Sequence, residues 1–136
     1  MDKKELEKLL PHRDPMLLLD EVTLEGETAL GKYCVRGDEF FLQGHFPGNP
    51  VVPGVILCEI LAQTACVLVK DGMAEGKTPL YTTIEKTRFR SPVYPGDRIE
   101  TSCRLIKVRE PFYYVQGTVM VGGKLKAQAS FSFVLM

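Results

Sequence analysis

Residues 55–69, VILCEILAQTACVLV, form the longest apolar stretch of the chain. Pro53 and Gly54 precede this stretch, as proline often does at the start of a helix, and no further helix breaker follows before Gly72. The sequence therefore predicts one long helix from Val55 to Lys70. Because apolar residues lie around nearly its whole circumference, protein must surround this helix on most sides.

The rest of the chain contains segments that are typical of β-strands. Six segments alternate apolar and polar residues or are rich in β-branched and aromatic residues: Met16–Leu24, Thr28–Arg36, Tyr81–Arg90, Arg98–Val108, Phe112–Val121 and Leu125–Leu135. Short turn sequences at 25–27 and 122–123 favour antiparallel hairpins. We therefore predict an α+β fold in which an antiparallel sheet of about six strands wraps around one long central helix, the arrangement known as the hot-dog fold.

The length and composition fit one domain. A chain of 136 residues, 45% of them hydrophobic and 25% charged, can bury a core of its own, so residues 1–136 are expected to form a single domain. A single sheet covers only one side of an apolar helix. We therefore expect a second copy of the chain to cover the remaining apolar surface, which predicts a homodimer.

Charge and residue types argue against several kinds of partner. Seventeen basic and seventeen acidic side chains give a formal net charge of zero, which offers no support for nucleic acid as a partner. The apolar stretch is too short to span a bilayer and the N-terminus lacks the pattern of a secretory signal, so we expect no membrane insertion and a cytoplasmic location. The four cysteines are expected to be reduced core residues, and with only two histidines we expect no metal and no other cofactor.

Glu59 lies one turn inside the apolar helix, where an unpaired carboxylate would be costly. The simpler interpretation is a structural carboxylate that bonds to Gln63 one turn further on, or that reaches a subunit rim. The functional interpretation is that desolvation keeps its proton bound near neutral pH, so that Glu59 can act as a general acid. The residues alone leave both interpretations open.

Two further residues suit the same chemistry. His45 lies in a loop rich in proline and glycine, and an imidazole can act as a general base near neutral pH, although most such histidines are structural. Gly54 precedes the helix, where unpaired backbone N–H groups can stabilise negative charge on a thioester oxygen, although a glycine there can also be a simple turn residue. Base, acid and oxyanion donor are together the groups that an elimination beside a carbonyl needs.

Ordered motifs resemble one enzyme family over nearly the whole chain. LPHRDPMLLLD at 10–20 is followed by GHFPGNPVVPGVILCE at 44–59, which continues as EILAQ to residue 63, and by RFRSPVYPGD at 88–97. This order is similar to that of the FabZ-type 3-hydroxyacyl-acyl-carrier-protein dehydratases of type II fatty acid biosynthesis. Asp14 and Met16 depart from the family's usual Pro-His-Arg-x-Pro-Phe, which leaves the shape of the tunnel entrance open.

The resemblance implies a hydro-lyase that removes water from (3R)-3-hydroxyacyl thioesters and forms trans-2-enoyl thioesters. The family's catalytic pair is the histidine of Gly-His-Phe-Pro and the glutamate fourteen positions later, which correspond here to His45 and Glu59. Four residues are expected to bind the substrate or its oxyanion: Gly54, which matches the family's oxyanion glycine, Val55, Gln63 and Tyr81. Tyr81 is also a candidate gate, in the loop before the third strand.

The resemblance also implies partners. The substrate would arrive on the phosphopantetheine arm of an acyl carrier protein, whose acidic surface could meet a group of four cations: Lys86, Arg88, Arg90 and Arg98. A merely solvated sheet edge explains these cations equally well. The family places the histidine and glutamate of one site on opposing subunits of a dimer, and trimers of dimers are usual in it.

Two alternatives use the same fold. In an acyl thioesterase, Glu59 or a nearby carboxylate would direct water at the thioester carbonyl and release a free acid. The other alternative is a non-catalytic subunit that binds acyl carrier protein, against which the presence of His45, Gly54 and Glu59 argues.

Overall fold

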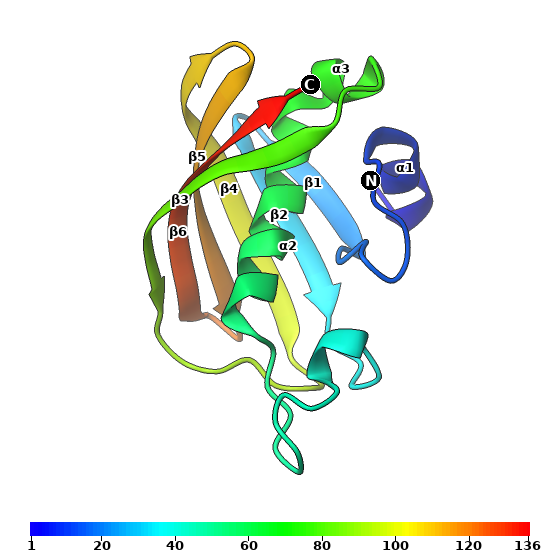
Figure 1. The fold of residues 1–136 in the computed structure, drawn as a ribbon, viewed down its shortest axis with the longest axis vertical. Helices are drawn as coiled ribbons and strands as arrows, with labels where there is room; N and C mark the ends of the chain where they lie inside the picture. Colours follow the sequence, from blue (N-terminus) through cyan, green and yellow to red (C-terminus); the bar gives the residue numbers. More distant parts are fainter.

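A computed structural model describes all residues from 1 to 136 and shows one sheet with a long helix against it (Figure 1). The helices are α1 (Lys3–Leu9), α2 (Gly54–Cys66) and α3 (Lys70–Ala74), with 3-10 turns at Phe40–Leu42 and Val67–Val69. The strands are β1 (Glu21–Glu25), β2 (Thr28–Cys34), β3 (Pro79–Phe89), β4 (Arg98–Arg109), β5 (Phe112–Val121) and β6 (Lys124–Leu135). They form one antiparallel sheet in the order β1-β2-β4-β5-β6-β3, which confirms the predicted hot-dog fold.

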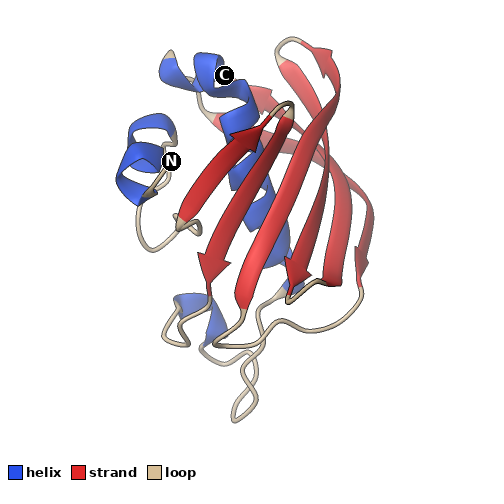
Figure 2. Cartoon of the chain, turned by 180° about the vertical axis from the view of Figure 1, so that it is seen from behind, coloured by secondary structure: helices blue, strands red, loops and turns tan.

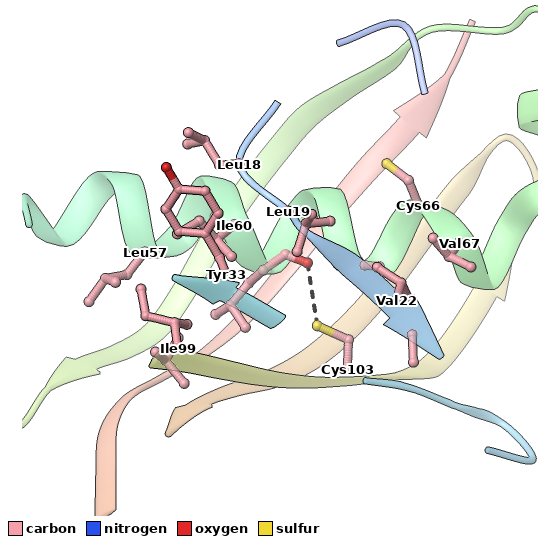
Figure 3. Packing of buried hydrophobic residues seen from close by; sticks show 14 of the residues in the cluster. Leu18, Leu19, Val22, Tyr33, Leu57, Ile60, Cys66, Val67, Ile99 and Cys103 are labelled. Carbon is pink, nitrogen blue, oxygen red and sulfur yellow. Dashed lines mark hydrogen bonds between the residues drawn. The ribbon is translucent and has the colours of Figure 1, made fainter. Parts of the chain in front are cut away.

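The sheet curves around α2, which lies along one face of it; Figure 2 shows the opposite face, with the strands in front of the helix. Helix α2 contacts β2, β4 and β5. Leu57 and Ile60 of the helix belong to the same buried cluster as Tyr33 of β2 and Ile99 of β4 (Figure 3). The main core therefore lies between the helix and the concave face of the sheet, as the apolar character of the helix requires.

Small residues of the sheet allow α2 to lie close to it. A Cβ atom on Gly31 of β2 would collide with Thr101 Oγ1 and would lie 2.7 Å from Thr64 Oγ1, and one on Gly117 of β5 would lie 3.0 Å from Leu61. At this contact the buried hydroxyls of Thr64 and Thr101 form a hydrogen bond of 2.7 Å between the helix and β4. The position of α2 over the sheet is thus determined by both packing and a buried polar pair.

Two predicted boundaries are wrong by more than two residues. The strand predicted from Met16 begins only at Glu21, because Leu17–Leu19 are all buried instead of alternating between two faces. The predicted helix ends at Cys66, and the 3-10 turn at Val67–Val69 leads into the separate helix α3. Val67 and Val69 are both buried and no proline or glycine lies in this turn, so tertiary packing rather than a local breaker ends the helix there.

Three of the four cysteines lie in the core as predicted: Cys58, Cys66 and Cys103. The prediction is wrong for Cys34, whose side chain points to the exposed face of β2. Burial raises the pKa of the Cys66 thiol to about 12, so this thiol stays protonated and unreactive at neutral pH. None of the helices has the length and apolar character needed to cross a membrane.

Candidate active site

His45 lies in a loop that backbone hydrogen bonds hold in place. Its N–H donates to Leu42 O, and its carbonyl oxygen accepts a bond of 2.9 Å from the N–H of Val51. His45 Nδ1 lies 3.1 Å from Val51 O. Because a carbonyl oxygen can only accept, Nδ1 must carry the hydrogen, which leaves Nε2 of the neutral ring free to accept a proton. This tautomer is the one that a general base requires.

The first turn of α2 lies beside this imidazole. His45, Gly54 and Val55 line one cavity of about 570 Å³, together with Phe89. No side chain caps the helix at Pro53, and the backbone N–H groups of Gly54 and Val55 make no hydrogen bond within the chain. A Cβ atom on Gly54 would lie 2.9 Å from the Phe89 ring, which only glycine avoids. We call His45, Gly54 and Val55 the His45 half-site.

Glu59 is held by its neighbour one turn along α2. Gln63 Nε2 donates to Glu59 Oε2 at 2.8 Å, which is the contact that the simpler interpretation predicts. Gln63 is fully buried; its amide also donates to Met16 O at 2.7 Å and accepts a bond of 2.8 Å from the N–H of Leu18. Both N–H groups and the oxygen of this amide therefore form hydrogen bonds within the chain, and Glu59 is hydrogen-bonded to a side chain that is itself fixed.

A second cavity, of about 40 Å³, contains Glu59 and Gln63 together with His12 and Tyr81. Tyr81 lies inside β3 and not in the loop before it, so that part of its prediction is wrong. Its hydroxyl donates to Cys58 O, and this bond fixes the ring beside the helix. We call these four residues the Glu59 half-site.

Sequence reasoning assigned no role to His12, yet its Nε2 lies 3.3 Å from Glu59 Oε2. Two features of the sequence could have indicated a role for His12: it lies in the first motif, LPHRDP, and it is the only histidine besides His45. Because His12 and Glu59 are far apart in the chain, no local spacing could reveal their contact. No group of three or more His, Cys, Asp or Glu side chains is arranged to hold a metal ion.

Within one chain, the predicted catalytic pair lines two different cavities, one containing His45 and the other Glu59. Gly54 and Glu59 are five residues apart on α2. At about 100° per residue, the two positions are separated by about 140° around the helix axis, so they face different sides of the helix. The two half-sites also lie at opposite ends of β3: Phe89 lines the His45 cavity, and Tyr81 lines the Glu59 cavity.

Comparisons with known proteins show the family of the chain. The model of a family described as a FabA-like domain matches residues 10–130. The chain is similar to a protein of Nitratidesulfovibrio vulgaris that is called 3-hydroxyacyl-(acyl-carrier-protein) dehydratase FabZ, with 46% identity over 95% of this chain and 87% of the relative. A protein of the same name from Oleidesulfovibrio alaskensis is 43% identical over 100% of this chain and 92% of the relative.

Among solved structures, the dehydratase heterocomplex ApeI:P from Xenorhabdus doucetiae has a chain that superposes with a TM-score of 0.81. The superposition covers 96% of this chain and 90% of the other. The two sequences are 20% identical, so this likeness supports the fold alone. The family model and the two relatives also show the family. The chain belongs to the FabA-like family and, within it, to the FabZ-type 3-hydroxyacyl-acyl-carrier-protein dehydratases.

Proposed function

We propose that this chain dehydrates (3R)-3-hydroxyacyl thioesters to trans-2-enoyl thioesters in fatty acid biosynthesis, in active sites that two subunits share. Each site would combine the His45 half-site of one subunit with the Glu59 half-site of the other. The observation that carries this proposal is the position of the two half-sites at opposite ends of the edge strand β3.

Strand β3 has the properties of a dimer interface. It ends the sheet, so one of its sides has no neighbouring strand, and its apolar side chains Leu80, Ile84 and Phe89 are about half exposed. The opposite edge strand, β1, is partly covered, because Asp2 bridges to Glu21. An unprotected edge with exposed apolar residues favours pairing with another strand, and β3 is the edge available for it.

A two-fold axis beside β3 would pair two copies of this strand antiparallel. The Tyr81 end of one copy would then lie beside the Phe89 end of the other. Because these ends belong to the Glu59 and His45 half-sites respectively, one pairing would complete two sites. This arrangement accounts for the separation of His45 and Glu59 within one chain.

The proposed reaction needs one base, one acid and one oxyanion donor. His45 Nε2 removes the proton from C2 of the substrate, while the backbone N–H groups of Gly54 and Val55 stabilise the negative charge on the thioester oxygen. The electron pair of the broken C–H bond forms the C2–C3 double bond. The C3–O bond breaks as Glu59 gives its proton to the hydroxyl, which leaves as water. Return of the proton from His45 to Glu59 through solvent restores both groups.

Acyl carrier protein is the proposed carrier of the substrate, in agreement with the names of the relatives. Arg90 lines the His45 cavity, and Arg88 and Arg98 are exposed near it in the chain. Cations near the entrance would attract an acidic carrier, so its association should slow as the salt concentration rises.

The activity is tested with a short (3R)-3-hydroxyacyl thioester of acyl carrier protein. We expect the wild type to form a conjugated enoyl thioester, visible by its ultraviolet absorbance, and we expect His45→Ala and Glu59→Gln each to lower kcat at least about a hundredfold. Release of free thiol without the enoyl product would contradict dehydration and favour the thioesterase. Full rates in both variants would contradict the assignment of the two residues.

The shared site is tested by complementation. A chain with His45→Ala and a chain with Glu59→Gln are co-expressed with different tags, and the heterodimer is purified. One of its two sites would contain both native groups, so we expect about half of the wild-type rate from two inactive chains. Homodimers of each variant serve as controls. A heterodimer as inactive as the homodimers would show that both groups act from one chain.

A further inference from the structure

Two nitrogen atoms from different parts of the chain approach the same oxygen of Glu59. Gln63 Nε2 donates to Oε2 at 2.8 Å, and His12 Nε2 lies 3.3 Å from the same atom. The other oxygen, Oε1, makes no hydrogen bond within the chain, and it is not buried. The two oxygens of this carboxyl group are therefore not equivalent.

The environment of His12 selects one tautomer of its ring. Nδ1 is buried and has no hydrogen-bond partner. Nδ1 lacks a partner in either tautomer, but a hydrogen on Nε2 points to the side of the ring where the carboxyl oxygen of Glu59 lies. The favoured neutral ring carries its hydrogen on Nε2, the atom that faces Glu59. His12 thus faces the carboxyl oxygen at ion-pair distance, without the alignment of a hydrogen bond.

The backbone around His12 is held firmly enough to position this ring. The Arg13 guanidinium donates to the carbonyl oxygens of Leu10 and His12 at 2.8 and 2.7 Å. Lys3 of α1 forms an ion pair of 2.7 Å with Asp14, the residue that departs from the family's motif. Contacts on both sides of His12 thus order the segment that carries it.

We propose that His12 is a positioning residue for the acid: its Nε2–H faces Oε2 of Glu59, to which the Gln63 amide donates, so that the acidic proton lies on Oε1. An oxygen that two N–H groups face is a poor place for a proton, because the proton would meet the hydrogens of both groups. Oε1, which is free of protein partners, then delivers the proton to the hydroxyl of the substrate. This inference rests on the proposed role of Glu59 as the general acid.

The test compares His12→Leu, which removes the donor, with His12→Gln, whose side-chain amide can place an N–H near the position of Nε2. We expect His12→Leu to lower kcat about 10- to 100-fold while KM changes less than about threefold, because a misplaced acid affects the chemical step more than binding. We expect His12→Gln to recover most of the rate. A loss that appears only in KM, or equal losses in both variants, would overturn the proposal.

A double variant separates positioning from damage to the fold. In the Glu59→Gln background there is no acidic proton to position, so His12→Leu should cause no further loss. A further loss of similar size would overturn the proposal. A heterodimer of the His12→Leu and His45→Ala chains should regain activity, because its one intact site takes His45 from the first chain and His12 with Glu59 from the second. No recovery would contradict the placement of His12 in the Glu59 half-site.

The outcomes for the two proposals are distinguishable. If Glu59→Gln is nearly inactive and His12→Leu has the wild-type kcat, only the role of His12 is wrong. If Glu59→Gln keeps the full rate, the acid has been misassigned and the inference about His12 fails with it.

Discussion

Glu39 is the only charged residue that the fold buries, with 6% of its surface exposed. Its carboxylate accepts a bond of 2.7 Å from the Tyr33 hydroxyl and bonds of 3.0 and 2.8 Å from the backbone N–H groups of Arg36 and Gly37. Burial acts to raise the pKa of Glu39, but these donors outweigh burial and hold the pKa below its usual value. The carboxylate thus anchors the chain just before the loop that carries His45.

We expect Glu39→Gln to lower the free energy of unfolding by about 1–3 kcal/mol at neutral pH, because an amide has one acceptor oxygen and places N–H groups where the carboxylate accepts. The pKa of Glu39 is lower in the folded than in the unfolded protein, so the carboxylate makes its full contribution to stability above the usual glutamate pKa. It disappears as the pH falls through the lowered value, and the two proteins should then become equally stable.

Urea unfolding at fixed protein concentration, at neutral pH and at a series of falling pH values, measures this difference. Glu27→Gln, the same change at an exposed residue, should alter the stability little at either pH. A deficit of Glu39→Gln that stays constant in acid would contradict the interpretation.

At the scale of elements, the distance between α2 and the sheet depends on the absence of a side chain at Gly31. We expect Gly31→Ala to lower the free energy of unfolding by about 1–3 kcal/mol, because the added methyl group must displace the hydroxyls of Thr101 and Thr64. Lys32→Ala, at the exposed next position of β2, is the matched control and should stay within about 0.5 kcal/mol of the wild type. Equal stability of the two variants in chemical denaturation would show that the helix can move away without cost.

At the scale of the whole molecule, activity should depend on assembly through β3. Ile84 of β3 and Ile106 of β4 are similarly exposed, at 49% and 52%. We expect Ile84→Lys to raise the dimer dissociation constant at least about tenfold, because a charge placed in an apolar contact is costly to bury. The activity should fall at protein concentrations where the dimer dissociates and return at high protein concentration. Ile106→Lys should leave the dissociation constant and the activity unchanged.

Sedimentation velocity and the enoyl absorbance assay, run over the same concentration series, measure both quantities. An Ile84→Lys protein that is fully dimeric and active would exclude β3 as the interface. A monomer with full activity would instead contradict the shared site.

The elements could be predicted because their signals are local. Period-two alternation and the two turn sequences placed the strands, and the apolar stretch of residues 55–69 required a central helix. The errors occur where tertiary contacts outweigh periodicity. Residues 16–19 satisfy backbone groups through the Gln63 amide instead of through a strand, and Cys34 points away from the core.

The sequence by itself determined the family, the reaction type and the identity of the candidate acid and base, because ordered motifs carry residue types and the chemistry of those types. Only the tertiary structure decided that His45 and Glu59 line separate cavities and that His12 lies beside Glu59. Motif order fixes the spacing of residues along the chain. Distances between remote segments depend on how the sheet curves around α2 and on which side of the helix each residue faces.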